Sequence, residues 1–289
     1  MDQGHRLLRA GEETFSFDLP QTLLRKGGDV DQIRQVCTVL TGAFDDAAAR
    51  DVRVCVHPPD AYSFFTPISS DVPVRDRKRQ LFQQAALVTG ARSADELYLD
   101  SQTVRTTQDS EGEPFMWVHV LGVPKAADEQ MSEVVGMLPM KRYDWIVSSE
   151  AVGRVSSRLE RTGGSAREAL RPYTLAVGQY PTHTEYFLSR NREWYHAHYA
   201  EEADSPENRA YFAVGFMNRV DVPLDAVGRL YVYGMDVDIG DYGRFVDIFD
   251  QVPEVLNPFR IVQSRSDPAE GEGALYAPCI GAGMDEYVG

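Results

Sequence analysis

Patterns typical of strands and patterns typical of helices alternate along the whole chain. The strand patterns are short apolar or alternating runs, whereas the helix patterns repeat apolar residues three and four positions apart. Such alternation is typical of an α/β fold, in which helices cover a largely parallel sheet. The predicted strands span 15–19, 52–56, 63–68, 96–104, 115–123, 143–147, 173–177, 185–188, 194–199, 230–234 and 258–262.

Several of the predicted helices begin at recognisable caps. Asp29 precedes a helical pattern that runs to Leu40. Ser205-Pro206-Glu207 places a capping hydroxyl, a proline and an acidic residue at the start of a helix that runs to Val220. The glycine-containing segment 161–167 is expected to link two halves of the chain. Further helices are predicted over 74–88, 127–138, 150–159 and 245–249.

The charge balance excludes one class of partner. The 289 residues include 44 acidic and 29 basic side chains, for a net charge of −15. Because so negative a surface repels a polyanion, nucleic-acid binding is not expected. Only four of the basic residues are lysines. Two explanations of this composition stay open: a salt-rich cytosol that screens self-repulsion, or an ordinary acidic protein from a GC-rich genome.

The cysteines and the apolar runs bear on the compartment. Cys37, Cys55 and Cys279 are widely spaced, which excludes a disulfide framework and a cysteine-rich zinc site. The first residues lack the apolar stretch of a signal peptide, and no run approaches the roughly 18 apolar residues of a membrane-spanning helix. We therefore expect a soluble cytoplasmic protein.

Two short motifs are candidates for chemistry. The segment 178–184 is a turn between two predicted strands that is able to cradle a phosphate, although spacing alone favours a purely structural hairpin. His196 and His198 share one face of a predicted strand. A metal site needs three or four converging ligands, so we expect a solvated histidine pair and no metal. A metal-binding protein or hydrolase that uses this pair is a rival hypothesis.

A family resemblance rests on five short segments. Segments 117–125 and 143–155 match a strand that ends in Val-Pro-Lys and a later strand–helix unit, and 175–184 matches a strand hairpin. Segments 256–259 and 276–283 match two late motifs. Together they resemble PilM, the actin-like protein family of type IV pilus assembly, and the related cytoplasmic domain of the type II secretion protein GspL. The resemblance implies a two-lobed actin-like (ribonuclease H-like) α/β fold with a small inserted α/β subdomain. It implies a first lobe over 1–62, the insert over 63–138, a return to the first lobe over 139–162 and a second lobe over 163–289.

The chain departs from this family at the nucleotide site. The family binds Mg-ATP with two phosphate hairpins that each carry an acidic residue, and with a glycine-rich adenosine loop. Here the first hairpin is missing from the start of the chain, the acidic position of the second falls on Ala176, and the adenosine loop keeps one glycine. We therefore expect a pseudo-ATPase without a cofactor. The rival hypothesis is an active actin-like ATPase or kinase that binds Mg-ATP through Gly178, Thr182, Thr184 and Gly234.

The resemblance also implies a partner. The chain is expected to be a non-catalytic cytoplasmic scaffold of a type IV pilus or a related secretion or motility apparatus, held at the inner-membrane face by its partners. In the family, the cytoplasmic tail of an inner-membrane protein docks in a groove of the first lobe beside the insert. The sequence leaves open whether the chain forms a homodimer. The groove would be lined here by Phe64, Phe65, Ile68, Leu81, Phe82 and Ala85.

Overall fold

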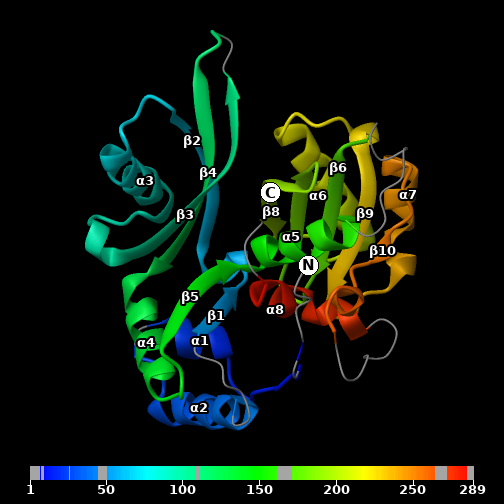
Figure 1. The fold of residues 1–289 in the computed structure, drawn as a ribbon. Coiled ribbons are helices and arrows are strands. Elements are labelled where there is room, and N and C mark those ends of the chain that lie inside the picture. The colour runs from blue at the N-terminus through cyan, green and yellow to red at the C-terminus, as the bar shows by residue number, and fades with distance from the viewer. Residues whose placement is uncertain are drawn as a thin grey trace. The chain divides into compact units, whose positions relative to one another are not determined.

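A computed structural model describes residues 7, 10–25, 27–44, 51–108, 111–161, 171–263 and 272–284. The chain divides into two units. Figure 1 shows the fold with a colour that follows the residue number. The N-terminal unit comprises Gly11–Val147, and the C-terminal unit comprises Met1–Ala10 together with Ser148–Gly289. Each unit has its own sheets and helices and is described separately.

The N-terminal unit contains two small sheets. Strands β1 (Asp51–Val56) and β5 (Arg142–Val147) form a parallel pair, and β2 (Tyr62–Ser69), β4 (Pro114–Pro124) and β3 (Leu97–Gln108) form an antiparallel sheet in the order β2-β4-β3. The helices of this unit are α1 (Leu19–Leu24), α2 (Val30–Phe44), α3 (Val74–Thr89) and α4 (Lys125–Gly136).

Two local features position these elements. The Asp29 carboxylate accepts hydrogen bonds from the backbone N–H groups of Asp31 and Gln32, so it caps α2 as the sequence predicts. Helix α4 is fastened to β5 through Asp128, whose carboxylate accepts hydrogen bonds from the Tyr143 hydroxyl at 2.7 Å and the Trp145 indole at 3.0 Å. Burial acts to raise the pKa of Asp128, but the hydrogen bonds from Lys125, Trp145 and Tyr143 outweigh it and the pKa is lowered.

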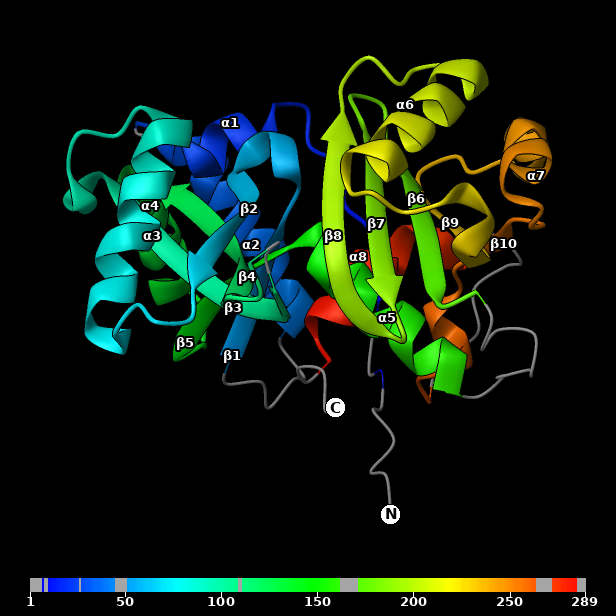
Figure 2. The same ribbon diagram turned by 90° about the horizontal axis from the view of Figure 1, so that it is seen from above.

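The C-terminal unit is built on one five-stranded sheet. Its strand order is β10-β9-β6-β7-β8, with β6, β9 and β10 parallel and the β6–β7 and β7–β8 pairs antiparallel. Helices α6 and α7 lie on one face of this sheet and α5 and α8 on the other (Figure 2). The strands are β6 (Tyr173–Gln179), β7 (Thr184–Arg190), β8 (Glu193–Ala200), β9 (Val227–Gly234) and β10 (Glu254–Val255), and the helices are α5 (Ser148–Arg161), α6 (Pro206–Arg219), α7 (Gly243–Phe249) and α8 (Ala277–Ala282).

Alternation along the strands separates the two layers of this unit. Leu175 and Val177 of β6 join one apolar core with Phe216 of α6 and Phe245 of α7. The residue between them, Ala176, therefore faces the opposite layer. The predicted cap of α6 is confirmed, because the Ser205 hydroxyl accepts a hydrogen bond from the Asn208 N–H and Pro206 occupies the first turn.

Two predicted strands are wrong. Segment 15–19 is not a strand, because the Asp18 carboxylate accepts a hydrogen bond from the Gln21 N–H and starts α1, with Pro20 in its first turn. Segment 258–262 begins with a 3₁₀ turn, Pro258–Arg260, because Asn257 caps the Phe259 N–H. In both cases a side-chain oxygen before a proline outweighed the apolar alternation.

The predicted link between the halves falls mostly on residues 162–170, outside the described residues. Helix α5, which the sequence analysis assigns to the first lobe, packs on α8 and belongs by its contacts to the C-terminal unit. None of the helices in the described part of the chain has the length and apolar character needed to cross a bilayer.

Candidate functional site

The four residues assigned to a nucleotide site come together at one end of strands β6, β7 and β9 of the C-terminal sheet. Residues 180–183 form the turn between β6 and β7, and the Tyr180 N–H donates to the His183 carbonyl at 3.0 Å. Gly178 therefore lies just before the turn, and Thr182 and Thr184 lie within and just after it. Gly234 ends β9 and lies opposite Gln179 of β6. The sequence-based expectation of a hairpin at this position is confirmed.

The aromatic ring of Tyr233 occupies the space beside Gly178. A Cβ atom added at Gly178 would lie 2.6 Å from Cε2 of Tyr233 and 2.7 Å from its hydroxyl oxygen. Both residues are at the same level of the sheet, because Gly178 pairs with Tyr233 in the β6–β9 register. The absence of a side chain at Gly178 thus makes room for another side chain of the same unit.

The other three positions have structural roles or point to the surface. Gly234 has φ +106°, and its α-carbon lies against the backbone of Gln179, so a side chain there would be strained and crowded. The buried hydroxyl of Thr184 donates to the Ala203 carbonyl at 2.9 Å. Thr182 is exposed, and its hydroxyl lies 3.1 Å from Nδ1 of His183.

A buried carboxylate lies directly behind this hairpin. Glu185 of β7 is fully buried, and its carboxylate accepts hydrogen bonds from the Ser148 hydroxyl at 2.6 Å and the Tyr233 hydroxyl at 2.8 Å. Nε2 of His183 lies 3.1 Å from the same carboxylate. Sequence reasoning missed Glu185, because carboxylates are so plentiful in this chain that one more at the start of a strand carries no signal.

Ala176 stands where the resemblance places the acidic residue of the second phosphate hairpin. It is fully buried and lies between Phe187 of β7 and Tyr231 of β9, which are buried as well. A carboxylate at this position would lie between two buried aromatic residues and would lose its hydration. The packing of this chain suits alanine here.

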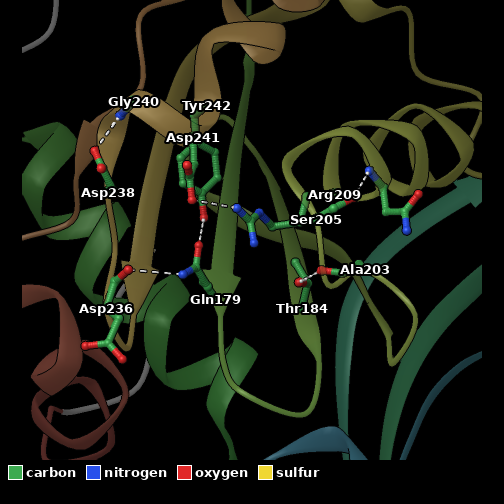
Figure 3. Close-up of polar contacts among 11 residues, drawn as sticks. Gln179, Thr184, Ala203, Ser205, Arg209, Asp236, Asp238, Gly240, Asp241 and Tyr242 are labelled. Atoms are coloured by element: carbon green, nitrogen blue, oxygen red, sulfur yellow. Dashed lines mark hydrogen bonds and ion pairs between the residues drawn. The ribbon is translucent and has the colours of Figure 1, made fainter.

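A second group of polar side chains lies at the same edge, on the α6 and α7 side (Figure 3). The Gln179 amide donates to the Asp236 carbonyl at 3.1 Å and accepts from the Tyr242 hydroxyl at 3.1 Å. Burial raises the pKa of Tyr242 to about 12, so this hydroxyl stays protonated as a donor. Arg209 donates to Asp241 at 3.1 Å and its guanidinium lies over the Tyr242 ring. These polar groups hold the loops of the edge together.

The predicted histidine pair packs on α6. The rings of His196 and His198 both lie within 6.0 Å of the Phe216 ring, measured between centroids. Burial, with the nearby charge of Arg219 as a smaller cause, lowers the pKa of His198 to about 4. Among the described residues no cysteine, carboxylate or third histidine completes a three-ligand group with these two. The rings are therefore partly buried and packed, where the sequence analysis expects a solvated pair.

The residues assigned to a partner groove divide into three sets. Ile68 and Ala85 are buried in the insert. Phe64 and Leu81 are half-buried and pack on the same apolar cluster as Ile68, which also contains Val118 and Val120. Phe65 lies on the other face of β2, with its ring 5.1 Å from that of His119, and Phe82 is half-buried on α3. The half-buried members are the ones that a partner is able to reach.

No family model matches the chain, and no curated protein matches it in sequence. Solved structures do match it. The PilM–PilN type IV pilus biogenesis complex is similar with a TM-score of 0.56 and 15% identity, over 90% of this chain and 87% of that chain. Weaker matches include a protein of unknown function with an actin-like ATPase fold from Bacteroides thetaiotaomicron, with a TM-score of 0.46 and 12% identity over 77% of each chain. The cytoplasmic domain of EpsL, an inner-membrane component of the Vibrio cholerae type II secretion system, matches with a TM-score of 0.43 and 10% identity, over 87% of this chain and 82% of that chain.

The match to the PilM structure concerns the fold, because the identity is low and the coverage is nearly complete. It agrees with the order of elements predicted from the sequence, in which strands and helices alternate through both units. The chain therefore adopts a mixed α/β fold similar to that of the solved PilM structure.

Proposed function

We propose that this protein is a non-catalytic scaffold of a type IV pilus or a related secretion or motility apparatus. It binds the cytoplasmic tail of an inner-membrane protein and is thereby held at the inner face of that membrane. The observation that carries the proposal is the fold match over 90% of the chain to a PilM whose solved structure is a complex with PilN. A scaffold role needs the fold and a docking surface but no catalytic group.

The interior of the hairpin supports the absence of catalysis. Magnesium-assisted phosphoryl transfer needs a carboxylate that holds the metal or its waters, and backbone N–H groups open to the phosphates. In this chain the acidic position is the buried Ala176, and the Tyr233 ring fills the space beside Gly178. Both features are properties of the packed C-terminal unit, so a ligand would have to displace core side chains to enter.

Electrostatics support the same conclusion. Three acidic residues, Asp236, Asp238 and Asp241, follow β9 at the same end of the strands (Figure 3). The nearby Arg209 is already paired with Asp241. A triphosphate brought to this edge would meet further negative charge in a chain whose net charge is −15.

Titration calorimetry with Mg-ATP and Mg-ADP tests the non-catalytic part of the proposal. The expected result is no saturable heat with the folded full-length chain. Binding in the micromolar range would contradict it and would favour the active ATPase or kinase. A parallel assay of phosphate release should give the same rate with and without the protein.

Affinity purification from the native host tests the partner. Bitopic inner-membrane proteins of a pilus or secretion system should be enriched with the wild-type chain. Phe82→Ala should reduce that recovery by about tenfold, since one truncated anchor of an interface is typically worth 1–2 kcal/mol. Leu87→Ala is the matched control on the same helix, because Leu87 is exposed and lies outside the assigned groove. Recovery of metabolic enzymes alone would contradict the scaffold.

A further inference from the structure

The strand β5 has an open edge. Within the described residues it pairs with one neighbour, the parallel strand β1. In a parallel pair only alternate residues bond to the neighbour, so the remaining N–H and C=O groups of β5 point to the other side. No further backbone hydrogen bond involves residues 142–144 in the described part of the chain. Such an edge is a template for another strand.

A groove runs along this open edge. It has a volume of about 410 Å³ and lies between the second half of α4, with Ser132 and Val135, and the chain from Met140 to Asp144. Consecutive strand residues point to opposite faces of a sheet. Because Arg142, Tyr143 and Asp144 all line the groove, it follows the edge of the strand and not one of its faces.

Aromatic and charged side chains lie on opposite faces of β5. Tyr143 and Trp145 bond to Asp128 of α4, so they face that helix. Arg142 and Asp144 lie on the other face, and both are exposed. Arg142 also bonds to Asp51 at 3.0 Å, but that pair is largely exposed to solvent and contributes little by itself. The edge thus presents one positive and one negative charge, two residues apart on one face.

This spacing is self-complementary. When two β5 strands pair antiparallel about a twofold axis at Tyr143, residues whose numbers sum to 286 lie opposite each other. Arg142 then faces Asp144 of the partner subunit, and Asp144 faces Arg142 of the partner subunit. Opposite charges at directly facing positions stabilise a strand pair, and a twofold axis forms both ion pairs at once.

We propose that the chain forms a symmetric dimer in which the β5 edges of two copies pair antiparallel through Arg142 and Asp144. The occupant of the groove is then a second copy of this chain. Met140, which lines the groove, supplies apolar area at the same edge. The proposal does not rest on the proposed function, because its observations concern the edge of β5 and not the assigned partner groove.

Sedimentation velocity over a concentration series tests the proposal with the full-length chain at low salt. Wild type should show a reversible monomer–dimer equilibrium. Asp144→Arg makes the facing charges both positive and Arg142→Asp makes them both negative. Each variant should therefore weaken dimerisation by at least about tenfold. Asp71→Arg, at an exposed position before α3, carries the same charge change and should leave the dimer unchanged.

The decisive sample is an equimolar mixture of the two charge-reversed variants. One copy then presents two positive charges and the other two negative charges, so the mixture should dimerise although neither variant does so alone. Circular dichroism melts check that each variant is folded. A wild-type chain that stays monomeric at its highest soluble concentration overturns the proposal and leaves the edge to an extended peptide of another protein. A dimer that survives Asp144→Arg, or a mixture that stays monomeric, also overturns it.

Discussion

The ring of Tyr233 packs against Gly178 on the neighbouring strand of the C-terminal sheet, and its hydroxyl donates a 2.8 Å hydrogen bond to the buried Glu185. The contact joins β9, β6 and β7 beside the hairpin that the sequence resemblance assigns to phosphate binding. In this chain the same geometry serves packing, which is the physical basis for the proposed loss of catalysis.

Gly178→Ala should destabilise the protein. The added methyl group would meet a ring that is unable to move freely, because its hydroxyl is bonded to Glu185. The expected loss is about 1–3 kcal/mol, as in other overpacked cores, measured by chemical denaturation. Gly215→Ala is the control, because a Cβ there meets nothing within 4 Å and alanine favours a helix. Equal stability of the two variants would contradict the close contact between Gly178 and the Tyr233 ring.

Tyr233→Phe should separate the ring from its hydrogen bond. The ring still fills the space beside Gly178, but the Glu185 carboxylate loses one of its donors in a fully buried position. Leaving a buried acceptor without its donor costs about 1–3 kcal/mol, again measured by denaturation. Tyr211→Phe should have almost no effect, since Tyr211 is 72% exposed. A Tyr233→Phe protein as stable as wild type would show that Glu185 does not need this donor.

His198→Phe should flatten the dependence of stability on pH. The pKa of His198 is about 4 in the folded chain and 6.5 when unperturbed, so protons bind more tightly to the unfolded state. Its contribution is therefore complete above pH 6.5 and is lost as the pH falls toward 4. Because the ring is only partly buried, we expect about 1–2 kcal/mol over this range.

Phenylalanine preserves the stacking on Phe216 but is unable to bind a proton. The measurement is the free energy of unfolding of wild type and variant at several pH values, and the difference between the two curves isolates His198. Parallel curves between pH 6.5 and 4 would mean that the ring is not protonated on unfolding in this range.

Gly281→Ala should loosen the contact between α5 and α8. A Cβ at Gly281 would lie 2.6 Å from the carbonyl carbon of Ala151, so the two helices would have to separate. Arg154 spans the same contact, donating to the Met284 carbonyl at 2.7 Å and to Glu150 at 2.6 Å. We expect a loss of about 1–3 kcal/mol and a lower melting temperature.

Gly136→Ala, at the end of α4, meets nothing within 4 Å and is the matched control. If the folded Gly281→Ala variant had the same melting temperature as wild type, the close approach of α8 to α5 would not limit stability.

The sequence was most informative where apolar alternation or a helix cap alone decides the secondary structure. Apolar alternation located β1, β2, β4, β5 and all the long strands of the C-terminal unit, and Asp29 and Ser205 marked the starts of two helices. The same alternation failed at 15–19 and 258–262, where capping by Asp18 and Asn257 beside a proline decided the backbone. Periodicity measures burial, and a capped turn with apolar side chains has the same composition as a short strand.

The candidate site shows the same division. Its glycines and threonines were found from the sequence, because a turn between two strands has a local signature. Glu185 and Tyr233 were not found, because nothing local distinguishes them from the many other carboxylates and tyrosines of the chain. Their importance comes from the sheet order, which places β9 beside β6 and β6 beside β7 and so brings residues 178, 185 and 233 together.

By itself, the sequence determined the α/β class, the order of most elements and the negative net charge. Periodicity and caps depend on neighbours along the chain, and net charge depends on composition alone. Only the tertiary structure decided what the hairpin glycines accommodate and that β5 pairs with β1 alone within the described residues. Both depend on which strands lie side by side, and that choice is made by packing between residues far apart in sequence. The histidine pair illustrates the point: its spacing led us to expect a solvated pair, whereas its contacts with Phe216 make it part of a packed layer.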